Sequence, residues 1–208
     1  MPLQNRVDPF GHIQAVQERG LLMGNRGGRI HDPATKTLQK RRYASRRWII
    51  CTCVYKDWHR DVMGPGYTEL FFLDEVTALA AGHRPCAFCR RDAFKQFCQL
   101  IACTNSTEVS VEGIDRILHA QRIAPKPVVT DPCLKFPDGT MIAIGDAAYA
   151  KNGDDALTWS YSGYVRAVSW ADVLAQRPLL ITPCATVAVL RQNYAPVWHS
   201  SANNARSP

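Results

Sequence analysis

Two short runs dense in β-branched and aromatic residues, 47–55 and 67–73, predict strands in the first half of the chain. The turn sequence Met-Gly-Pro-Gly at 63–66 lies between them, so the two runs could pair as a hairpin. Asp74 suits the N-cap of a helix and Gly82 suits its C′ position, which predicts a short helix between them. The pattern therefore predicts a hairpin followed directly by a helix.

Two longer helices are predicted next, over residues 89–102 and 110–123, because apolar side chains recur every three or four positions in both. The sequence Ala-Pro-Lys-Pro at 124–127 ends the second helix and is typical of a linker. Beyond it, Asp-Gly and Asn-Gly turns at 138–139 and 152–153 separate short alternating segments, which indicates hairpins. The last part of the chain is therefore expected to be rich in β-structure.

Length and composition limit the class of protein. A chain of 208 residues suits one ordinary domain or two small ones. The sequence has no run of eighteen apolar residues, which predicts no membrane-spanning helix, and its first residues lack the apolar region of a secretory signal. The cytoplasm is the expected compartment, where stable disulfides are rare. Eight cysteines are then best interpreted as metal ligands and buried thiols.

The excess positive charge is confined to the beginning of the chain. Residues 1–60 contain 12 lysines and arginines and 4 acidic residues, a net charge of +8, whereas the remainder has a net charge of −1. Residues 1–47 predict a loosely structured basic arm, with its densest charge at 36–47. Such an arm would attract a polyanion; the alternative is a solvated basic face that keeps the protein soluble.

The pair Cys86-x-x-Cys89 allows three interpretations: a redox pair, half of a zinc site, or two buried thiols. Redox chemistry is less favoured because the pair follows a predicted helix and turn, not a strand. A closed zinc site needs further ligands, which Cys51 and Cys53 on the first predicted strand can supply. The turn before the pair could also bring His83 close, so the fourth ligand is open between Cys53 and His83.

The stretch Phe-Leu-Asp-Glu-Val-Thr-Ala-Leu-Ala-Ala-Gly-His-Arg-Pro-Cys-Ala-Phe-Cys-Arg, residues 72–90, resembles the zinc-binding module of Ada-type methylphosphotriester DNA repair proteins. The resemblance covers about residues 48–95 and centres on Ala-Gly-x-Arg-Pro-Cys-x-x-Cys. It implies that Cys86 and Cys89 are zinc ligands and that the protein contacts DNA. The family's other pair is Cys-x-x-x-Cys, one sulfur of which accepts a methyl group, whereas this chain has Cys51-x-Cys53.

A zinc ion here could have either of two roles. A structural zinc would stabilise a surface that binds phosphates, and this binding would weaken as the salt concentration rises. The predicted nucleic-acid-binding residues are Lys40, Arg41, Arg42, Arg46, Arg47, Arg84, Arg90 and Arg91. A catalytic zinc would keep an open position for water and need a neighbouring acid or base, for which Glu69, Asp74 and Glu75 are candidates. Asp74 and Glu75 are also explained by the start of a helix.

Together these patterns predict an α+β fold with a zinc-stabilised hairpin and helix module, followed by helices and a small β-rich C-terminal unit. The expected parts are a basic arm (1–47), an Ada-like zinc module with a helical connector (48–124), a β-rich unit (128–199) and a disordered tail (200–208). The preferred function is a zinc-containing, nucleic-acid-binding protein, with DNA as the expected partner and no membrane. The alternative is a zinc-dependent enzyme, either a hydrolase or a zinc-thiolate acceptor of alkyl groups.

Overall fold

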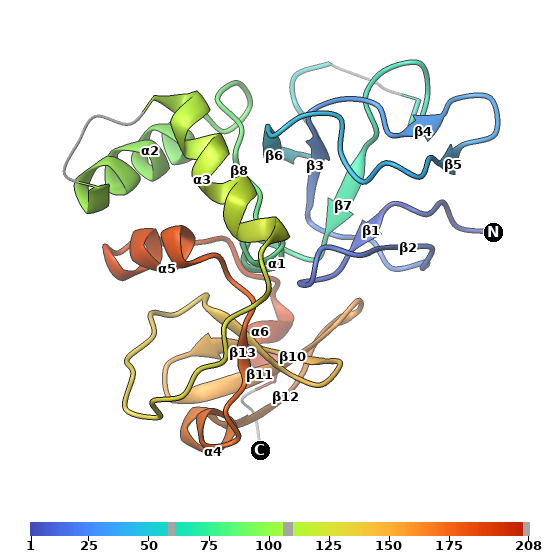
Figure 1. Cartoon of the computed structure of the whole chain (residues 1–208). Coiled ribbons are helices and arrows are strands. Elements are labelled where there is room, and N and C mark those ends of the chain that lie inside the picture. The colour runs from blue at the N-terminus through green and yellow to red at the C-terminus, as the bar shows by residue number, and fades with distance from the viewer. Residues whose placement is uncertain (58–60, 106–109, 206–208) are drawn as a thin grey trace.

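Two large sheets, one in each half of the chain, organise the described residues, and two short strands of the first half form a small third sheet (Figure 1). The computed structural model describes residues 1–57, 61–105 and 110–205. Helices and strands are both present in these residues, so the predicted α+β class is confirmed. The first half contains β1 (Arg6–Val7), β2 (Ile13–Gln14), β3 (Leu22–Arg26), β4 (His31–Asp32), β5 (Thr37–Leu38), β6 (Trp48–Thr52), β7 (Leu70–Phe72), α1 (Glu75–Ala80) and β8 (Arg84–Pro85).

The first sheet has six strands in the order β2-β1-β7-β3-β6-β8. The strand β3 lies between β6 and β7 and pairs antiparallel with both. The expected hairpin between residues 47–55 and 67–73 is therefore wrong, because β3 occupies the position between the two strands. Residues 1–47 also differ from the expected loose arm, since β1, β2 and β3 belong to this sheet and Arg26 on β3 is only 2% exposed.

The helix α1 lies between the two halves of the protein, and all of its residues are buried. Ala78 and Leu79 pack into the core beside the first sheet, whereas Val76 and Ala80 pack into the core beside the second. Its polar residues Glu75 and Thr77 are buried as well, and their side chains form hydrogen bonds. The predicted N-cap is confirmed, because the Asp74 carboxylate accepts a hydrogen bond of 2.9 Å from the backbone N–H of Thr77.

The second half carries the longer helices and an antiparallel sheet in the order β12-β11-β10-β9-β13. Its elements are α2 (Arg91–Asn105), α3 (Val111–Ile123), β9 (Met141–Ile144), β10 (Ala147–Asn152), β11 (Asp155–Ser160), β12 (Gly163–Ser169), α4 (Trp170–Ala175), β13 (Leu179–Leu180), α5 (Cys184–Arg191) and α6 (Ser201–Asn204). The Asn-Gly turn at 152–153 joins β10 and β11 as predicted. The segment before the turn at 138–139 is not a strand, so that hairpin does not form. Among the described residues, no helix has the length and apolar character needed to cross a bilayer.

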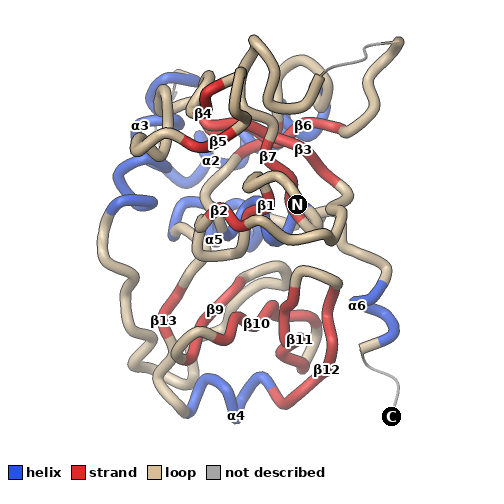
Figure 2. Tube along the Cα trace, turned by 90° about the vertical axis from the view of Figure 1, so that its right-hand side faces the viewer, coloured by secondary structure: helices blue, strands red, loops and turns tan. Residues whose placement is uncertain are grey.

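The C-terminal segment packs on the second sheet and is not the expected disordered tail over residues 200–205. The helix α6 lies beside β12 (Figure 2), where the Ser201 hydroxyl accepts a hydrogen bond of 2.8 Å from the backbone N–H of Tyr164. Ala202 is 2% exposed and belongs to the core of that half. Residues 206–208 lie outside the described residues.

Candidate metal centre

The thiols of Cys51, Cys86 and Cys89 form a compact cluster in which every sulfur lies within 4.8 Å of the others. Sulfurs that share one tetrahedral zinc at about 2.3 Å are about 3.8 Å apart, so the cluster fits a single metal ion with little movement. Three soft thiolate ligands favour zinc, copper(I) or iron–sulfur chemistry over magnesium or calcium. The structure thus contains a three-cysteine site that could hold a metal.

The pairing of β6 with β8 brings the cysteines together. These strands run parallel with Ile50 opposite Pro85, and the backbone N–H of Cys86 donates a hydrogen bond of 2.9 Å to the Ile50 carbonyl. Cys51 and Cys86 are the next residues along the two strands, so they end side by side. The chain then turns, with the Phe88 backbone N–H 3.4 Å from the Cys86 sulfur, and returns Cys89 to the same place.

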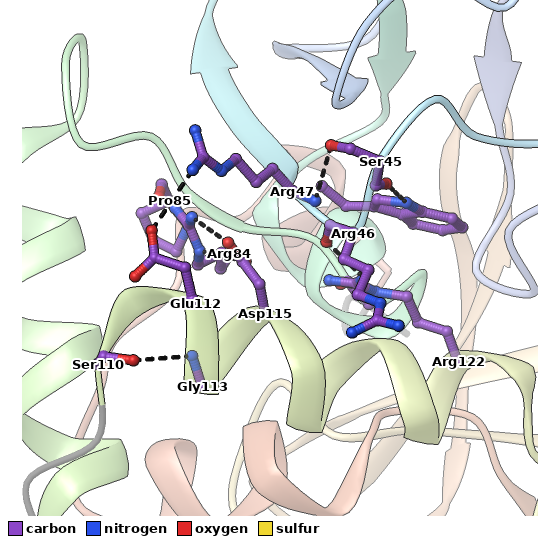
Figure 3. A network of polar contacts seen from close by, with 12 residues as sticks. Ser45, Arg46, Arg47, Arg84, Pro85, Ser110, Glu112, Gly113, Asp115 and Arg122 are labelled. Atoms are coloured by element: carbon purple, nitrogen blue, oxygen red, sulfur yellow. Dashed lines mark hydrogen bonds and ion pairs between the residues drawn. The ribbon is translucent and has the colours of Figure 1, made fainter.

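Two buried ion pairs hold the segment that carries Cys86 and Cys89. Arg84 donates two hydrogen bonds of 2.8 Å to Asp115 on α3, and both side chains are 4% exposed (Figure 3). Arg90 donates two hydrogen bonds of 2.8 Å to Glu75 on α1, which also accepts one of 2.7 Å from the Tyr194 hydroxyl. The cysteine segment is therefore fixed at both ends by planar, bidentate contacts.

The prediction that Arg84 and Arg90 belong to a phosphate-binding surface is wrong. Arg84 and Arg90 are already satisfied by internal carboxylates, because the chain folds α1 and α3 against them, and they are not free to bind phosphate. Of the other predicted residues, Arg47 pairs with exposed Glu112, whereas Lys40, Arg41, Arg42, Arg46 and Arg91 lie at the surface. Nucleic-acid binding stays a prediction that depends on this exposed group.

The three thiols lie close enough to shift one another's pKa. Hydrogen bonds from the thiols of Cys51 and Cys89 lower the pKa of Cys86 to about 2, and the bond to Cys86 raises the pKa of Cys51. A metal ion held by these thiols would displace their protons, so metal binding here would depend on pH.

The two candidates for a fourth ligand both lie outside the cluster. The Cys53 sulfur is 3.4 Å from the carbonyl of Leu21 and the residue is exposed, because β6 ends at Thr52 and the chain bends away. His83 is fully buried, with its ring 4.7 Å from Phe72 and 4.9 Å from Trp48 between ring centroids. Trp48 and Phe72 lie on the face of the sheet opposite to Cys51. The His83 ring therefore lies on that face too, away from the cysteine cluster.

A cavity of about 260 Å³ adjoins the cysteine cluster, and we call it the cysteine cavity. Side chains of a strand alternate between faces, and the cavity is lined by alternate residues of three neighbouring strands. They are Met23 and Asn25 on β3, Ile49 and Cys51 on β6, and Glu69 and Phe71 at β7, together with Cys86, Cys89 and the flanking residues Thr52, Cys53, Tyr55, Val62, Tyr67 and Phe88. All three cysteines of the cluster thus form part of the cavity wall.

Of the three acidic residues suggested by the sequence, only Glu69 lines this cavity. Its residue is 3% exposed, and one carboxylate oxygen accepts a hydrogen bond of 2.8 Å from the backbone N–H of Met63. Asp74 caps α1 and accepts a bond of 2.9 Å from the Tyr164 hydroxyl, and Glu75 holds Arg90, so both have structural roles. Glu69 and Cys51 are distant in the sequence. They reach the same face of the sheet because β3 pairs with both β6 and β7.

Comparison with family models, curated proteins and solved structures found no match to this chain. The resemblance to Ada-type modules therefore stays an expectation from the sequence.

Proposed function

We propose that the protein is a zinc-dependent hydrolytic enzyme whose active site is the cysteine cavity. The observation that supports this most directly is that the three-cysteine cluster and the buried carboxylate of Glu69 line the same cavity. Catalytic zinc sites commonly use three protein ligands and leave a fourth position for water, whereas structural sites use four. Among the described residues, no fourth cysteine, histidine or carboxylate joins the cluster.

The proposed division of work follows from the side chains present. Cys51, Cys86 and Cys89 would hold the zinc ion, which when bound would lower the pKa of a water molecule below its value in bulk water and polarise the substrate. Glu69 would act as the general base, accepting a proton from water and delivering it to the leaving group. The Met63 N–H fixes one Glu69 oxygen and so orients the carboxylate. Hydrolysis would divide the water molecule between the two products. Its hydroxyl would bond to the attacked carbon, and its other hydrogen would go to the leaving group, whose bond to that carbon breaks.

The cavity also limits the substrate class. Three thiolates outweigh the charge of one zinc ion, and Glu69 adds a carboxylate, so an anionic substrate would be repelled. Much of the remaining lining is apolar, with Met23, Ile49 and Phe71 among it. A neutral or cationic small molecule that can enter about 260 Å³ fits these properties best.

Cobalt substitution tests the proposal without knowledge of the substrate. In the cobalt(II) protein, added azide should change the ligand-field bands, because an exogenous ligand can enter only an open position. The bands should also titrate with pH, and Glu69→Gln should lower the midpoint by about one pH unit, because it removes a nearby negative charge that opposes deprotonation. Glu112→Gln, which changes an exposed glutamate on α3, is the control and should leave the midpoint unchanged.

A closed site would give a different result. If neither azide nor Glu69→Gln changes the cobalt spectrum, the metal has four protein ligands and the hydrolytic proposal is wrong. Mass spectrometry after exposure to methyl iodide distinguishes the alternative function, a zinc-thiolate acceptor of alkyl groups. If the protein is an acceptor, one cluster cysteine should gain a single methyl group. If it is a hydrolase, the cluster cysteines should stay unmodified.

A further inference from the structure

A second group of polar side chains lies on the opposite face of the first sheet. The guanidinium carbons of Arg26 and Arg122 lie 4.0 and 4.6 Å from the ring centroid of Trp48. Arg26 and Trp48 come from the paired strands β3 and β6, and Arg122 comes from the last turn of α3. Two cations from distant parts of the chain therefore share one aromatic side chain.

Neither arginine has a carboxylate partner among the described residues. Arg26 donates to the carbonyls of Gly11 at 2.7 Å and Arg42 at 3.4 Å. Arg122 donates to the carbonyls of Gly82 at 2.6 Å and Arg46 at 3.0 Å, the latter visible in Figure 3. The Nε atom of Arg26 and one terminal nitrogen of Arg122 are buried without a hydrogen-bond partner.

The nearest acidic residues are already engaged elsewhere. Asp8 accepts hydrogen bonds from the backbone N–H of His12 at 2.9 Å and from its ring at 3.1 Å, and Asp115 is paired with Arg84. Burial lowers the pKa of Arg26 despite Asp8, and burial together with Arg26 and Arg84 lowers the pKa of Arg122 despite Asp115. Guanidinium groups remain charged in proteins, so these shifts indicate positive charge that lacks a counter-charge.

The two arginines line a cavity of about 290 Å³, which we call the arginine pocket. Its lining also includes Arg42, Lys126 and His12, and it contains no aspartate or glutamate among the described residues. Burial and the charge of Arg122 lower the pKa of Lys126 as well. The pocket thus gathers basic side chains around two that are buried and only partly satisfied.

We propose that the arginine pocket binds the phosphate group of a small phosphorylated molecule. A phosphate dianion supplies two negative charges, which match the two uncompensated guanidiniums, and its oxygens accept the paired N–H bonds that arginine offers. Arg42 and Lys126 at the edge of the pocket would hold the remaining oxygens. This site is separate from the cysteine cavity and does not depend on the proposed hydrolytic function.

The test uses the full-length, zinc-loaded protein with inorganic phosphate as the probe. Thermal unfolding is measured as phosphate is increased at constant ionic strength, with chloride as the balancing anion, and calorimetry gives the dissociation constant. Because a ligand that binds only the folded state stabilises it, the unfolding temperature should rise and saturate. Arg122→Met removes the guanidinium but keeps an unbranched side chain, and it should weaken phosphate binding about tenfold or more.

Two further variants make the result decisive if Arg122→Met folds poorly. Arg42→Gln alters an exposed residue at the edge of the pocket and should weaken binding severalfold. Arg116→Gln alters an exposed residue of α3 outside the lining and should leave binding unchanged. The proposal is overturned if phosphate stabilises no more than chloride, or if Arg42→Gln and Arg116→Gln behave alike. It is also overturned if only an oligonucleotide without terminal phosphates binds, since that indicates a nucleic-acid surface.

Discussion

Replacing Cys86 by serine is expected to reduce the bound zinc from about one ion per chain to near zero. Cys86 is one of the three cysteines whose sulfurs all lie within 4.8 Å of one another. Structural zinc sites bind with about 10–16 kcal/mol of apparent free energy in small peptides, so losing one of three ligands should also destabilise the fold. Metal analysis of protein purified without added metal, together with its unfolding temperature, measures both effects.

Cys53→Ser is the matched control for this experiment. Cys53 lies two residues beyond Cys51 and lines the same cavity, but its thiol is not in the cluster. The Cys53→Ser protein should therefore keep its zinc. If it loses the metal as completely as Cys86→Ser does, the site uses four sulfurs and the three-ligand description is wrong.

Asp115→Asn is expected to lower the free energy of unfolding by about 3–5 kcal/mol. The substitution leaves Arg84 buried at 4% exposure without its counter-charge, and a buried unpaired charge is costly. For a chain of this size the unfolding temperature should fall by roughly 10 °C. Chemical denaturation with urea at neutral pH gives the free energy directly.

The same helix provides the comparison for Asp115. Glu112 lies one turn earlier on α3 and pairs with Arg47 at 3.4 Å, with both side chains 66% exposed. Exposed pairs of this kind contribute about 0–1 kcal/mol, so Glu112→Gln should have little effect on stability. Equal losses in the two variants would mean that helix α3 itself, and not the buried ion pair, determines the stability.

Elements defined by neighbouring residues could be predicted from the sequence. The cap at Asp74, the helix that follows it and the approach of Cys51 to the Cys86–Cys89 pair all rest on local patterns or on the ligand preferences of zinc. The strand β3 could not be predicted in this way, because Leu-Met-Gly-Asn-Arg has weak strand propensity and forms a strand only between β6 and β7.

The ion pairs of Arg84 and Arg90 could not be predicted, because their partners lie far from them in the sequence. Arg84 meets Asp115 and Arg90 meets Glu75, which lie 31 and 15 positions away. One signal was present in the sequence: Asp115 follows Ile114 and lies three residues before Leu118, so it stands beside the apolar face of its helix. An acidic residue at such a position indicates a buried cationic partner.

The strands β3 and β6 carry residues of both proposed sites on alternate positions: Asn25 and Cys51 face the cysteine cavity, whereas Arg26 and Trp48 face the arginine pocket. A shift of one residue in the pairing of these strands would turn each set toward the other side. Both proposed binding properties, for zinc and for phosphate, would thus depend on one alignment of backbone atoms. A variant that loses both has misaligned the strands, whereas one that loses a single activity has lost a ligand, so each site serves as the folding control for the other.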